Sequence, residues 1–298
     1  VMAASDKVLV LGGCGYVGSR VVPFLRARGL DATVADLCLR GDPLDLCDIQ
    51  IDYRDVPRRW LADYGTIILL AGHSSVGQAI RDPQGAFRNN VVGLFDLLDK
   101  LDGHRFIYAT TSSVYDGAGS EPVDEDHATF LPRNMYDLSK YVGDALLGVM
   151  QPHAIGLRLG TVVGASGNQR NDLMFNAMVR SARTDGVVRV FNPDVHRPIL
   201  ALSDLERAVG ALVERDPAPA GLYNLCSFNT TPRQAGEFIA ATLGARLDVE
   251  DEPSDTYDFS MSNRRFADAA AFQFHGSAES VVSELIPAYP ERAESALS

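Results

Sequence analysis

The chain has 298 residues, of which 46% are hydrophobic and 22% are charged, a composition typical of a globular protein rather than a disordered one. Its 27 basic and 39 acidic residues give a net charge of −12, which argues against a surface for nucleic acids or anionic membranes. The longest aliphatic stretch, residues 67–71, is far shorter than the ~20 residues that cross a bilayer, and the first residues contain no apolar signal-like segment. We therefore expect a cytoplasmic protein of one large or two unequal domains.

Strands and helices alternate through the first half of the chain. Short aliphatic runs predict strands, and longer stretches with one apolar face predict helices. The predicted strands are Val8–Leu11, Asp31–Asp36, Thr66–Leu70, Phe106–Tyr108 and Ile155–Leu159. The predicted helices are a first one that ends at Arg26, and then Pro83–Leu101 and Pro132–Met150. This alternation predicts an α/β fold, a Rossmann-type doubly wound parallel sheet with helices on both faces.

The alternation weakens after residue 164, where a polar loop at 164–171 begins a region of short elements. The predicted helices there are Leu173–Ala182 and Pro232–Leu243, the predicted strands are Val187–Phe191 and Leu222–Leu225, and residues 244–270 are expected to be irregular and acidic. We expect residues 1–164, joined by returning segments near 195–226, to form the first domain. Residues 165–298 should form mainly a smaller C-terminal α/β domain that binds the substrate.

A glycine-rich loop, Gly12-Gly13-Cys14-Gly15-Tyr16-Val17-Gly18, joins the first predicted strand to the first helix. Glycines at 12, 15 and 18 permit a tight turn and close approach to a pyrophosphate, which the amides of the helix N-terminus would face. An ordinary strand-to-helix turn, the simpler alternative, needs only one or two glycines. The strand before the loop and the helix after it favour a dinucleotide site. Its predicted residues are Gly12, Gly15, Tyr16, Val17 and Gly18.

Asp36 stands at the end of the second predicted strand. A carboxylate at this position accepts hydrogen bonds from both ribose hydroxyls and repels a 2′-phosphate, so it favours NAD over NADP. The simpler alternative is a solvated aspartate at the end of a strand. Arg40 lies close behind Asp36 and would invert the preference if it reached a 2′-phosphate.

Tyr136 and Lys140 are four residues apart on a predicted helix and therefore share one face. A free tyrosine has a pKa near ~10 and is a poor base at neutral pH, but a neighbouring ammonium and an oxidised nicotinamide would lower that pKa. The hydroxyl-rich residues 110–115 follow a predicted strand, at the edge where a parallel sheet binds its ligands. An amphipathic surface pair is the alternative, and the order of these motifs along the chain favours an active site.

These residues together resemble the extended short-chain dehydrogenase/reductase family, in particular its NAD-dependent nucleotide-sugar epimerase/dehydratase branch, over about residues 7–285. The resemblance implies three catalytic residues, Thr111, Tyr136 and Lys140. It also implies that a bound NAD contacts Tyr136 and Lys140 in addition to the glycine loop. The further cofactor contacts that it implies are Asp52, Tyr53, Leu70, Ala71, Gly72 and Asn90.

The same resemblance implies a substrate site in the second half of the chain, where Asn171-Asp172-Leu173 meets the nucleotide, Phe191 lies near its base and Arg197 contacts its pyrophosphate. His73, Ser112 and Ser113 could also line this site, although His73 is equally well explained as an ordinary loop histidine. The chain departs from the family at three kinds of position. Thr161 replaces an asparagine, Ser74 and Asn263 replace lysines, and the acidic residues 250–252 would repel a diphosphate.

The expected function is NAD-dependent epimerisation of a nucleotide-linked sugar through a transient keto intermediate, with Tyr136 as acid and base. One alternative is a one-way NAD(P)H-dependent ketoreductase or dehydrogenase for a keto sugar or another small carbonyl compound. Another is a regulator that binds the dinucleotide without chemistry. No metal is expected, because the six histidines have no metal-like spacing and the four cysteines form no CxxC pair. The resemblance also implies a homodimer formed through the helices predicted at 83–101 and 132–150.

Overall fold

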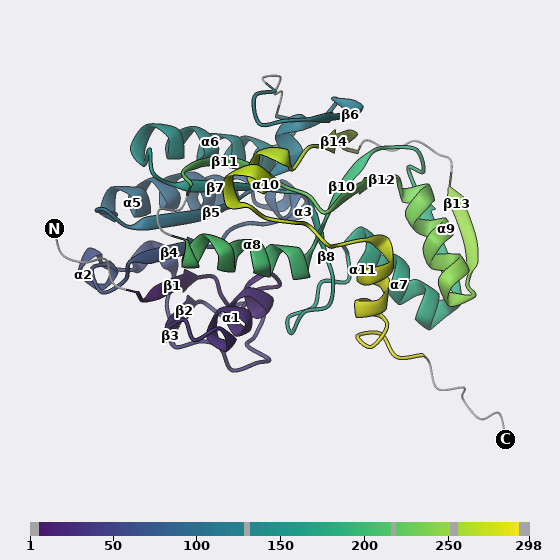
Figure 1. Ribbon diagram of the computed structural model, residues 1–298, viewed down its shortest axis with the longest axis horizontal. Coiled ribbons are helices and arrows are strands. Elements are labelled where there is room, and N and C mark those ends of the chain that lie inside the picture. The colour runs from purple at the N-terminus through teal and green to yellow at the C-terminus, as the bar shows by residue number, and fades with distance from the viewer. Residues whose placement is uncertain (1–5, 128–131, 216–218, 251–255, 292–298) are drawn as a thin grey trace.

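The computed structural model describes residues 6–127, 132–215, 219–250 and 256–291. Its centre is a seven-stranded sheet with the order β3-β2-β1-β4-β5-β7-β11 (Figure 1), and all neighbouring strands are parallel. The strands are β1 (Val8–Leu11), β2 (Ala32–Asp36), β3 (Ile49–Gln50), β4 (Thr66–Leu69), β5 (Arg105–Thr111), β7 (Ile155–Leu159) and β11 (Gly221–Leu225). The predicted doubly wound α/β fold is confirmed.

Helices cover both faces of this sheet (Figure 1). The even-numbered residues of β1 pack with α1 (Gly18–Ala27) and α8 (Leu202–Glu214). The odd-numbered residues of β1 pack on the opposite face with α5 (Gly93–Lys100) and α6 (Met135–Met150). Because successive side chains of a strand point to opposite faces, a sheet covered on both sides requires a continuously apolar strand, and β1 meets this requirement.

The strand order reverses at the centre of the sheet, because β2 lies on one side of β1 and β4 lies on the other. Open parallel sheets bind ligands in the crevice outside the carboxyl ends of their strands at this kind of switch point. The glycine loop follows β1, and residues 70–72 follow β4. Both predicted cofactor segments therefore lie at the switch point.

The C-terminal part of the chain contains smaller sheets. One sheet contains β8 (Thr161–Val163), β10 (Arg197–Ala201) and β12 (Phe228–Thr230), and two-stranded sheets pair β9 (Val187–Phe191) with β13 (Arg246–Glu250) and β6 (Gly119–Val123) with β14 (Phe259–Met261). The helices α7 (Met174–Asp185), α9 (Pro232–Leu243) and α11 (Ala278–Leu285) (Figure 1) pack around a separate apolar cluster with β8, β9, β10, β12 and β13. Further helices are α2 (Arg58–Leu61), α3 (Val76–Arg81), α4 (Pro83–Phe87) and α10 (Arg264–Ala270). Within the described ranges, no helix has both the length and the apolar character that crossing a membrane requires.

The prediction that residues 244–270 are irregular is wrong, since they contain β13, β14 and α10. In β13, Leu247 and Val249 alternate with charged residues and pack against the C-terminal apolar cluster. The acidic composition of this segment therefore concealed a strand that is apolar on one side only. Asp251 and Glu252, the last two residues of the acidic stretch, lie outside the described residues.

The helix predicted at 83–101 is present, but it is interrupted. It consists of α4 (Pro83–Phe87), the π-helical turn η2 (Arg88–Val92) and α5. Such turns are rare in proteins and are frequent at functional sites. Here the turn carries Asn90, whose side chain is buried.

Candidate active site

The loop after β1 contains two glycines that packing requires and one that leaves open space. Gly12 has a φ of +90°, and a Cβ there would collide with the backbone of Ala71. A Cβ at Gly18, the first residue of α1, would collide with the carbonyl of Gly13. A Cβ at Gly15 would meet no atom nearer than 3.6 Å. The backbone at Gly15 is therefore open to a ligand, as close approach to a pyrophosphate requires.

Asp36, the last residue of β2, lies directly against this loop. Its carboxylate accepts the backbone N–H of Cys14 at 2.9 Å and the backbone N–H of Cys38 at 2.8 Å. Each carboxylate oxygen has two lone pairs, so both keep a free acceptor position. The geometry is compatible with the predicted recognition of ribose hydroxyls.

The other residues predicted around the loop have structural contacts of their own. The backbone N–H groups of Leu70 and Ala71 both donate to the carbonyl of Leu11, which joins the ends of β1 and β4. Val17 is half-buried at the start of α1. Tyr16 is buried, and its hydroxyl donates to the carbonyl of Gly164 at 2.9 Å. The hydroxyl of Tyr16 thus binds the C-terminal part of the chain.

The predicted adenine contacts, Asp52 and Tyr53, lie at the short 3-10 helix η1 (Tyr53–Asp55). Asp52 accepts the backbone N–H of Arg54 at 3.0 Å and forms an ion pair with the guanidinium of the same residue. Tyr53 is buried, and its hydroxyl donates to the carbonyl of Asn89. Asp52 therefore caps η1, Tyr53 fastens η1 against η2, and a contact of either residue with adenine remains a prediction.

Asn90 holds the segment that follows β4. Its side-chain oxygen accepts the N–H of His73 at 2.9 Å, and its amide donates to the carbonyl of His73 at 3.1 Å and to the hydroxyl of Ser139 at 3.0 Å. A Cβ at Gly72 would lie 3.1 Å from the Asn90 oxygen and 3.8 Å from the Nζ atom of Lys140. Residues 72 and 73 are therefore placed beside the predicted catalytic lysine.

Thr111, Tyr136 and Lys140 meet at the carboxyl end of β5. Thr111 is the last residue of β5, Tyr136 and Lys140 stand one turn apart on α6, and Tyr136 forms a side-chain hydrogen bond with Thr111. Lys140 is 7% exposed. Its ammonium donates to the carbonyl of Ala109 at 3.0 Å and lies 4.9 Å from the ring centre of Tyr108. The structure thus brings together the three residues predicted to be catalytic.

Burial acts on the pKa of both members of the tyrosine–lysine pair. It raises the pKa of Tyr136, while the hydrogen bond with Thr111 and the positive charge of Arg170 oppose this rise. Burial lowers the pKa of Lys140 to about 8, and the negative charge of Asp144 opposes this fall. Lys140 therefore remains mostly protonated at neutral pH. Arg170 is a cation whose charge favours the phenolate of Tyr136 in this structure, and the same role of Lys140 stays a prediction.

Arg170 is a functional candidate that the sequence did not reveal. It lies in the loop between β8 and α7, where its Nε atom donates to Asp172 at 3.0 Å. Burial lowers the pKa of Arg170, but the pairing with Asp172 outweighs this, and the charge of Tyr136 raises the pKa further. A single arginine in a polar loop matches no motif. Its proximity to Tyr136 follows only from the tertiary fold.

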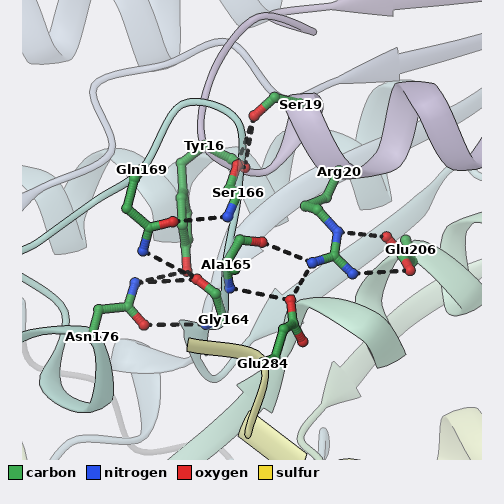
Figure 2. A network of polar contacts seen from close by, with 10 residues as sticks. All are labelled: Tyr16, Ser19, Arg20, Gly164, Ala165, Ser166, Gln169, Asn176, Glu206 and Glu284. Carbon is green, nitrogen blue, oxygen red and sulfur yellow. Dashed lines mark hydrogen bonds and ion pairs between the residues drawn. The ribbon is translucent and has the colours of Figure 1, made fainter. Parts of the chain in front are cut away.

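A polar network joins this loop to the helix that follows the glycine loop (Figure 2). Arg20 of α1 donates to Glu206 at 2.9 Å and to the carbonyl of Ala165 at 2.7 Å, and it also pairs with Glu284. The hydroxyl of Ser166 donates to the carbonyl of Tyr16 at 2.6 Å. The network therefore holds the start of the 164–171 loop against α1 and the glycine loop.

The two serines predicted to line the substrate site are bound to the protein. Ser112 donates from its hydroxyl to the carbonyl of Leu159 at 2.8 Å, which fastens it to β7. Ser113 donates to Asp137 at 2.7 Å, and the hydroxyl of Tyr257 donates to the same carboxylate at 2.9 Å. Asp137, which the sequence analysis did not single out, is buried next to Tyr136 and has its pKa raised by that burial.

His73 presents an unusual feature next to Gly72. Its Nδ1 atom is buried and has no hydrogen-bond partner among the described residues. A buried polar atom without a partner is costly, and a bound ligand is one way to satisfy it.

A cavity of about 500 Å³ opens in the C-terminal part of the chain. Four of the predicted substrate residues line it, namely Asn171, Asp172, Phe191 and Arg197. The other four, His73, Leu173, Ser112 and Ser113, are not part of its lining. Leu173, which directly precedes α7, packs instead against the apolar cluster of the main sheet. Arg197 is half-buried, and desolvation lowers its pKa.

The parallel sheet with its switch point, the glycine loop and the cluster of Thr111, Tyr136 and Lys140 agree with the family that the sequence resembles. Residues 8–226 match the model of the NAD dependent epimerase/dehydratase family. The chain belongs to this family.

Individual relatives agree with this assignment. The chain is 31% identical to UDP-glucose 4-epimerase of Corynebacterium glutamicum over 175 residues, which are 54% of this chain and 53% of that protein. It is 26% identical to UDP-glucuronate 4-epimerase 6 of Arabidopsis thaliana over 280 residues, which are 80% of this chain and 60% of that protein. The chain thus spans about half the length of the bacterial relatives it matches.

Solved structures show the same fold. An NAD dependent NDP-hexosamine 5,6-dehydratase involved in tunicamycin biosynthesis superposes with a TM-score of 0.83 and 21% identity, covering 94% of this chain and 97% of that one. UDP-glucuronic acid 4-epimerase from Bacillus cereus, in complex with UDP-glucuronic acid and NAD, superposes with a TM-score of 0.80 and 21% identity, covering 93% and 97%.

Proposed function

We propose that this chain is an NAD-dependent epimerase that inverts a hydroxyl-bearing carbon of a nucleotide-linked sugar through a keto intermediate. The observation that carries this proposal is the assembly of Thr111, Tyr136 and Lys140 next to the open glycine loop. The names of the relatives, several of them UDP-glucose 4-epimerases, favour a UDP-linked sugar as the substrate.

The residues at the switch point fit a nicotinamide dinucleotide. Gly15 leaves space for the pyrophosphate, the Asp36 carboxylate can accept ribose hydroxyls, and the unpartnered Nδ1 of His73 lies next to Gly72, beside Lys140. Asp36 would repel a 2′-phosphate, so NAD is the expected cofactor and NADP the less favoured one. When bound, NAD would take up a hydride from the sugar carbon and return it.

The residues of the chain carry out the proton transfer. Tyr136, as a phenolate, accepts the proton of the sugar hydroxyl, and Thr111 hydrogen-bonds to the oxygen of that hydroxyl. The ammonium of Lys140 binds the ribose, and the guanidinium of Arg170 favours the phenolate of Tyr136. After the keto sugar has turned its other face, the same tyrosine returns the proton to the oxygen.

We place the nucleotide of the substrate in the cavity lined by Asn171, Asp172, Phe191 and Arg197. Arg197 supplies a permanent positive charge for the diphosphate, because a guanidinium is not deprotonated in proteins. Phe191 is 53% exposed and offers a ring on which the base can stack. In this arrangement residues 1–164 bind mainly the cofactor and residues 165–298 bind mainly the substrate.

The test is to incubate the protein with UDP-glucose and, separately, with UDP-glucuronate, and to resolve epimers by chromatography and NMR. Tyr136→Phe should lower turnover by the ~10²–10⁴-fold typical of a lost general acid or base. Tyr141→Phe, an exposed tyrosine on the same helix, should leave it unchanged. Near-normal turnover of the Tyr136→Phe variant would contradict the assignment of Tyr136.

The state of the cofactor separates this proposal from its alternative. Freshly purified protein is denatured, and any released nucleotide is identified by mass spectrometry. Stoichiometric NAD is expected, because an epimerase regenerates its cofactor in each cycle. An empty site, together with net consumption of NADH or NADPH on a keto sugar and no epimer, would instead identify a one-way reductase.

We also infer a homodimer formed through the helices of residues 83–101 and α6. Val92, Phe95 and Val149 stand on these helices and are 45%, 49% and 83% exposed, and burial of such side chains against a second copy would stabilise a dimer. Sedimentation equilibrium should give twice the mass of the chain, and Phe95→Glu should shift the protein to monomer. A monomer from the natural sequence at micromolar concentration would refute the inference.

A further inference from the structure

Three of the four cysteines meet at the glycine loop, although Cys14 belongs to this loop and Cys38 and Cys47 belong to the loop after β2. The sulfur atoms of Cys14, Cys38 and Cys47 all lie within 4.8 Å of one another, and those of Cys14 and Cys38 are 3.9 Å apart. Cys14 is buried, and the other two are half-buried. The fourth cysteine, Cys226, lies apart from this group, with its sulfur 3.2 Å from the carbonyl oxygen of Phe228.

Two aspartates hold the backbone of this thiol cluster, which consists of Cys14, Cys38 and Cys47. The carboxylate of Asp36 accepts the N–H of Cys14 and the N–H of Cys38, at 2.9 and 2.8 Å. The carboxylate of Asp42 accepts the N–H of Cys47 at 2.8 Å. Cys38 has a φ of 55°, a left-handed conformation that a non-glycine residue adopts only where its surroundings impose it. The fold therefore fixes all three cysteines from their backbones.

Asp42 also approaches the cluster with its side chain. The pKa of Asp42 lies below its ordinary value. Burial raises this pKa, but hydrogen bonds from the amides of Leu46 and Cys47 and from the thiol of Cys14 lower it by more. The ligand atoms that lie together are the three sulfurs, and the Asp42 carboxylate lies beside them. The cluster thus offers three sulfur ligands and a neighbouring negative charge.

We infer that the thiols of Cys14, Cys38 and Cys47 form a binding site for a thiophilic divalent cation of the zinc type, next to the carboxylate of Asp42. Zinc takes four ligands in a tetrahedron, with Zn–S bonds of about 2.3 Å. Two bonds of that length across the 3.9 Å between Cys14 and Cys38 enclose an angle of about 115°, close to tetrahedral. Binding forms three metal–sulfur bonds and releases three protons to the solvent, and no electron is transferred.

A metal ion fits the cluster better than a disulfide does. The sulfurs of a disulfide are about 2.0 Å apart, well below the 3.9 Å between Cys14 and Cys38. A thiophilic cation replaces the thiol protons as it binds, and the carboxylates of Asp36 and Asp42 beside the cluster attract it.

The site would clip the segment from Cys38 to Cys47 onto the glycine loop. Sequence alone gave no indication of it, because its ligands do not show the close pairing of a zinc finger. The inference concerns the thiols only and is independent of the proposed reaction. A protein that binds the metal but lacks epimerase activity would support the metal site and contradict the proposed reaction. A protein that is an epimerase but binds no metal would do the opposite.

The test titrates the full chain, reduced and freed of metal with a chelator, with Co²⁺ and with Zn²⁺. We expect one equivalent per chain, thiolate-to-cobalt charge-transfer absorption in the near ultraviolet, and an increase in melting temperature with Zn²⁺. Cys38→Ser and Cys47→Ser should each weaken binding at least tenfold, and Asp42→Asn should weaken it less. Cys226→Ser is the matched control and should bind like the natural protein.

Three results would overturn the inference. They are the absence of charge-transfer bands in the natural protein, equal affinity in Cys38→Ser and Cys226→Ser, and loss of two free thiols from the metal-free protein in air, which would show a disulfide. If Cys226→Ser does not fold, the release of protons on Zn²⁺ addition decides, because only ligation by thiols expels them.

Discussion

Replacing Lys140 by methionine should abolish catalysis and should also change how the stability of the fold depends on pH. Burial lowers the pKa of Lys140 from 10.5 to about 8. The unfolded chain therefore binds this proton more tightly than the folded protein does. Lys140 opposes folding below about pH 8, and this opposition disappears as the pH rises toward the unfolded pKa of 10.5. The difference between the two pKa values corresponds to about 3 kcal/mol.

The assay is urea unfolding of the natural protein and of Lys140→Met, in the absence of cofactor, from about pH 7 to about pH 10.5. The free energy of unfolding of the variant minus that of the natural protein should decrease by about 3 kcal/mol across this range. The lost hydrogen bonds to Ala109 and Tyr108 lower this difference equally at every pH. Its dependence on pH therefore isolates the ionisation of Lys140.

Lys100→Met is the matched control, because Lys100 lies at the surface end of α5 and has its ammonium bound to backbone carbonyls. Its difference from the natural protein should not show the same decrease. A difference for Lys140→Met that stays constant from about pH 7 to about pH 10.5 would refute the reasoning, since it would mean that the folded protein leaves the pKa of this lysine unchanged.

Three further predictions concern the packing and charges of the site. Gly12→Ala should yield little folded protein because its Cβ meets the backbone of the segment after β4, whereas Gly15→Ala should fold and bind NAD more weakly in calorimetry. Arg158→Met should lower the free energy of unfolding in urea by about 3–5 kcal/mol, since it leaves the buried carboxylate of Asp144 unpaired; an unchanged midpoint would argue against this. Arg170→Gln should raise the pKa of Tyr136 and shift the rise of the pH–rate profile to higher pH. A profile that stays at its original pH would rule out the role of the Arg170 guanidinium.

The sequence allowed the main sheet to be predicted because its strands are short, apolar and bounded by turns. β1 and β7 have the predicted bounds, since a strand buried on both faces contains few polar residues. α8 was not predicted, although its buried residues follow a helical pattern. The interruption at Asn90 could not be predicted, because a π-helical turn keeps the composition of a helix.

The residues of the candidate site that could be predicted are likewise those whose arrangement is local in the sequence. Tyr136, Lys140 and the glycine loop were found because their spacing is local, and a helix or a turn fixes it. Arg170 and Asp137 were missed because their roles depend on which segments meet in the fold. The same reason explains the thiol cluster, whose members become neighbours only when the loop after β2 folds over the glycine loop.

The network around Arg20 has a consequence for the order in which ligands bind. This guanidinium joins α1, which begins beside the proposed pyrophosphate site, to α8, α11 and the loop that leads to the cavity proposed for the substrate. Occupation of the first site would therefore preorganise the second, and thermodynamic linkage requires the effect to be reciprocal. A sugar nucleotide should then bind more tightly to the protein that already holds its dinucleotide, and the dinucleotide should dissociate more slowly from the ternary complex.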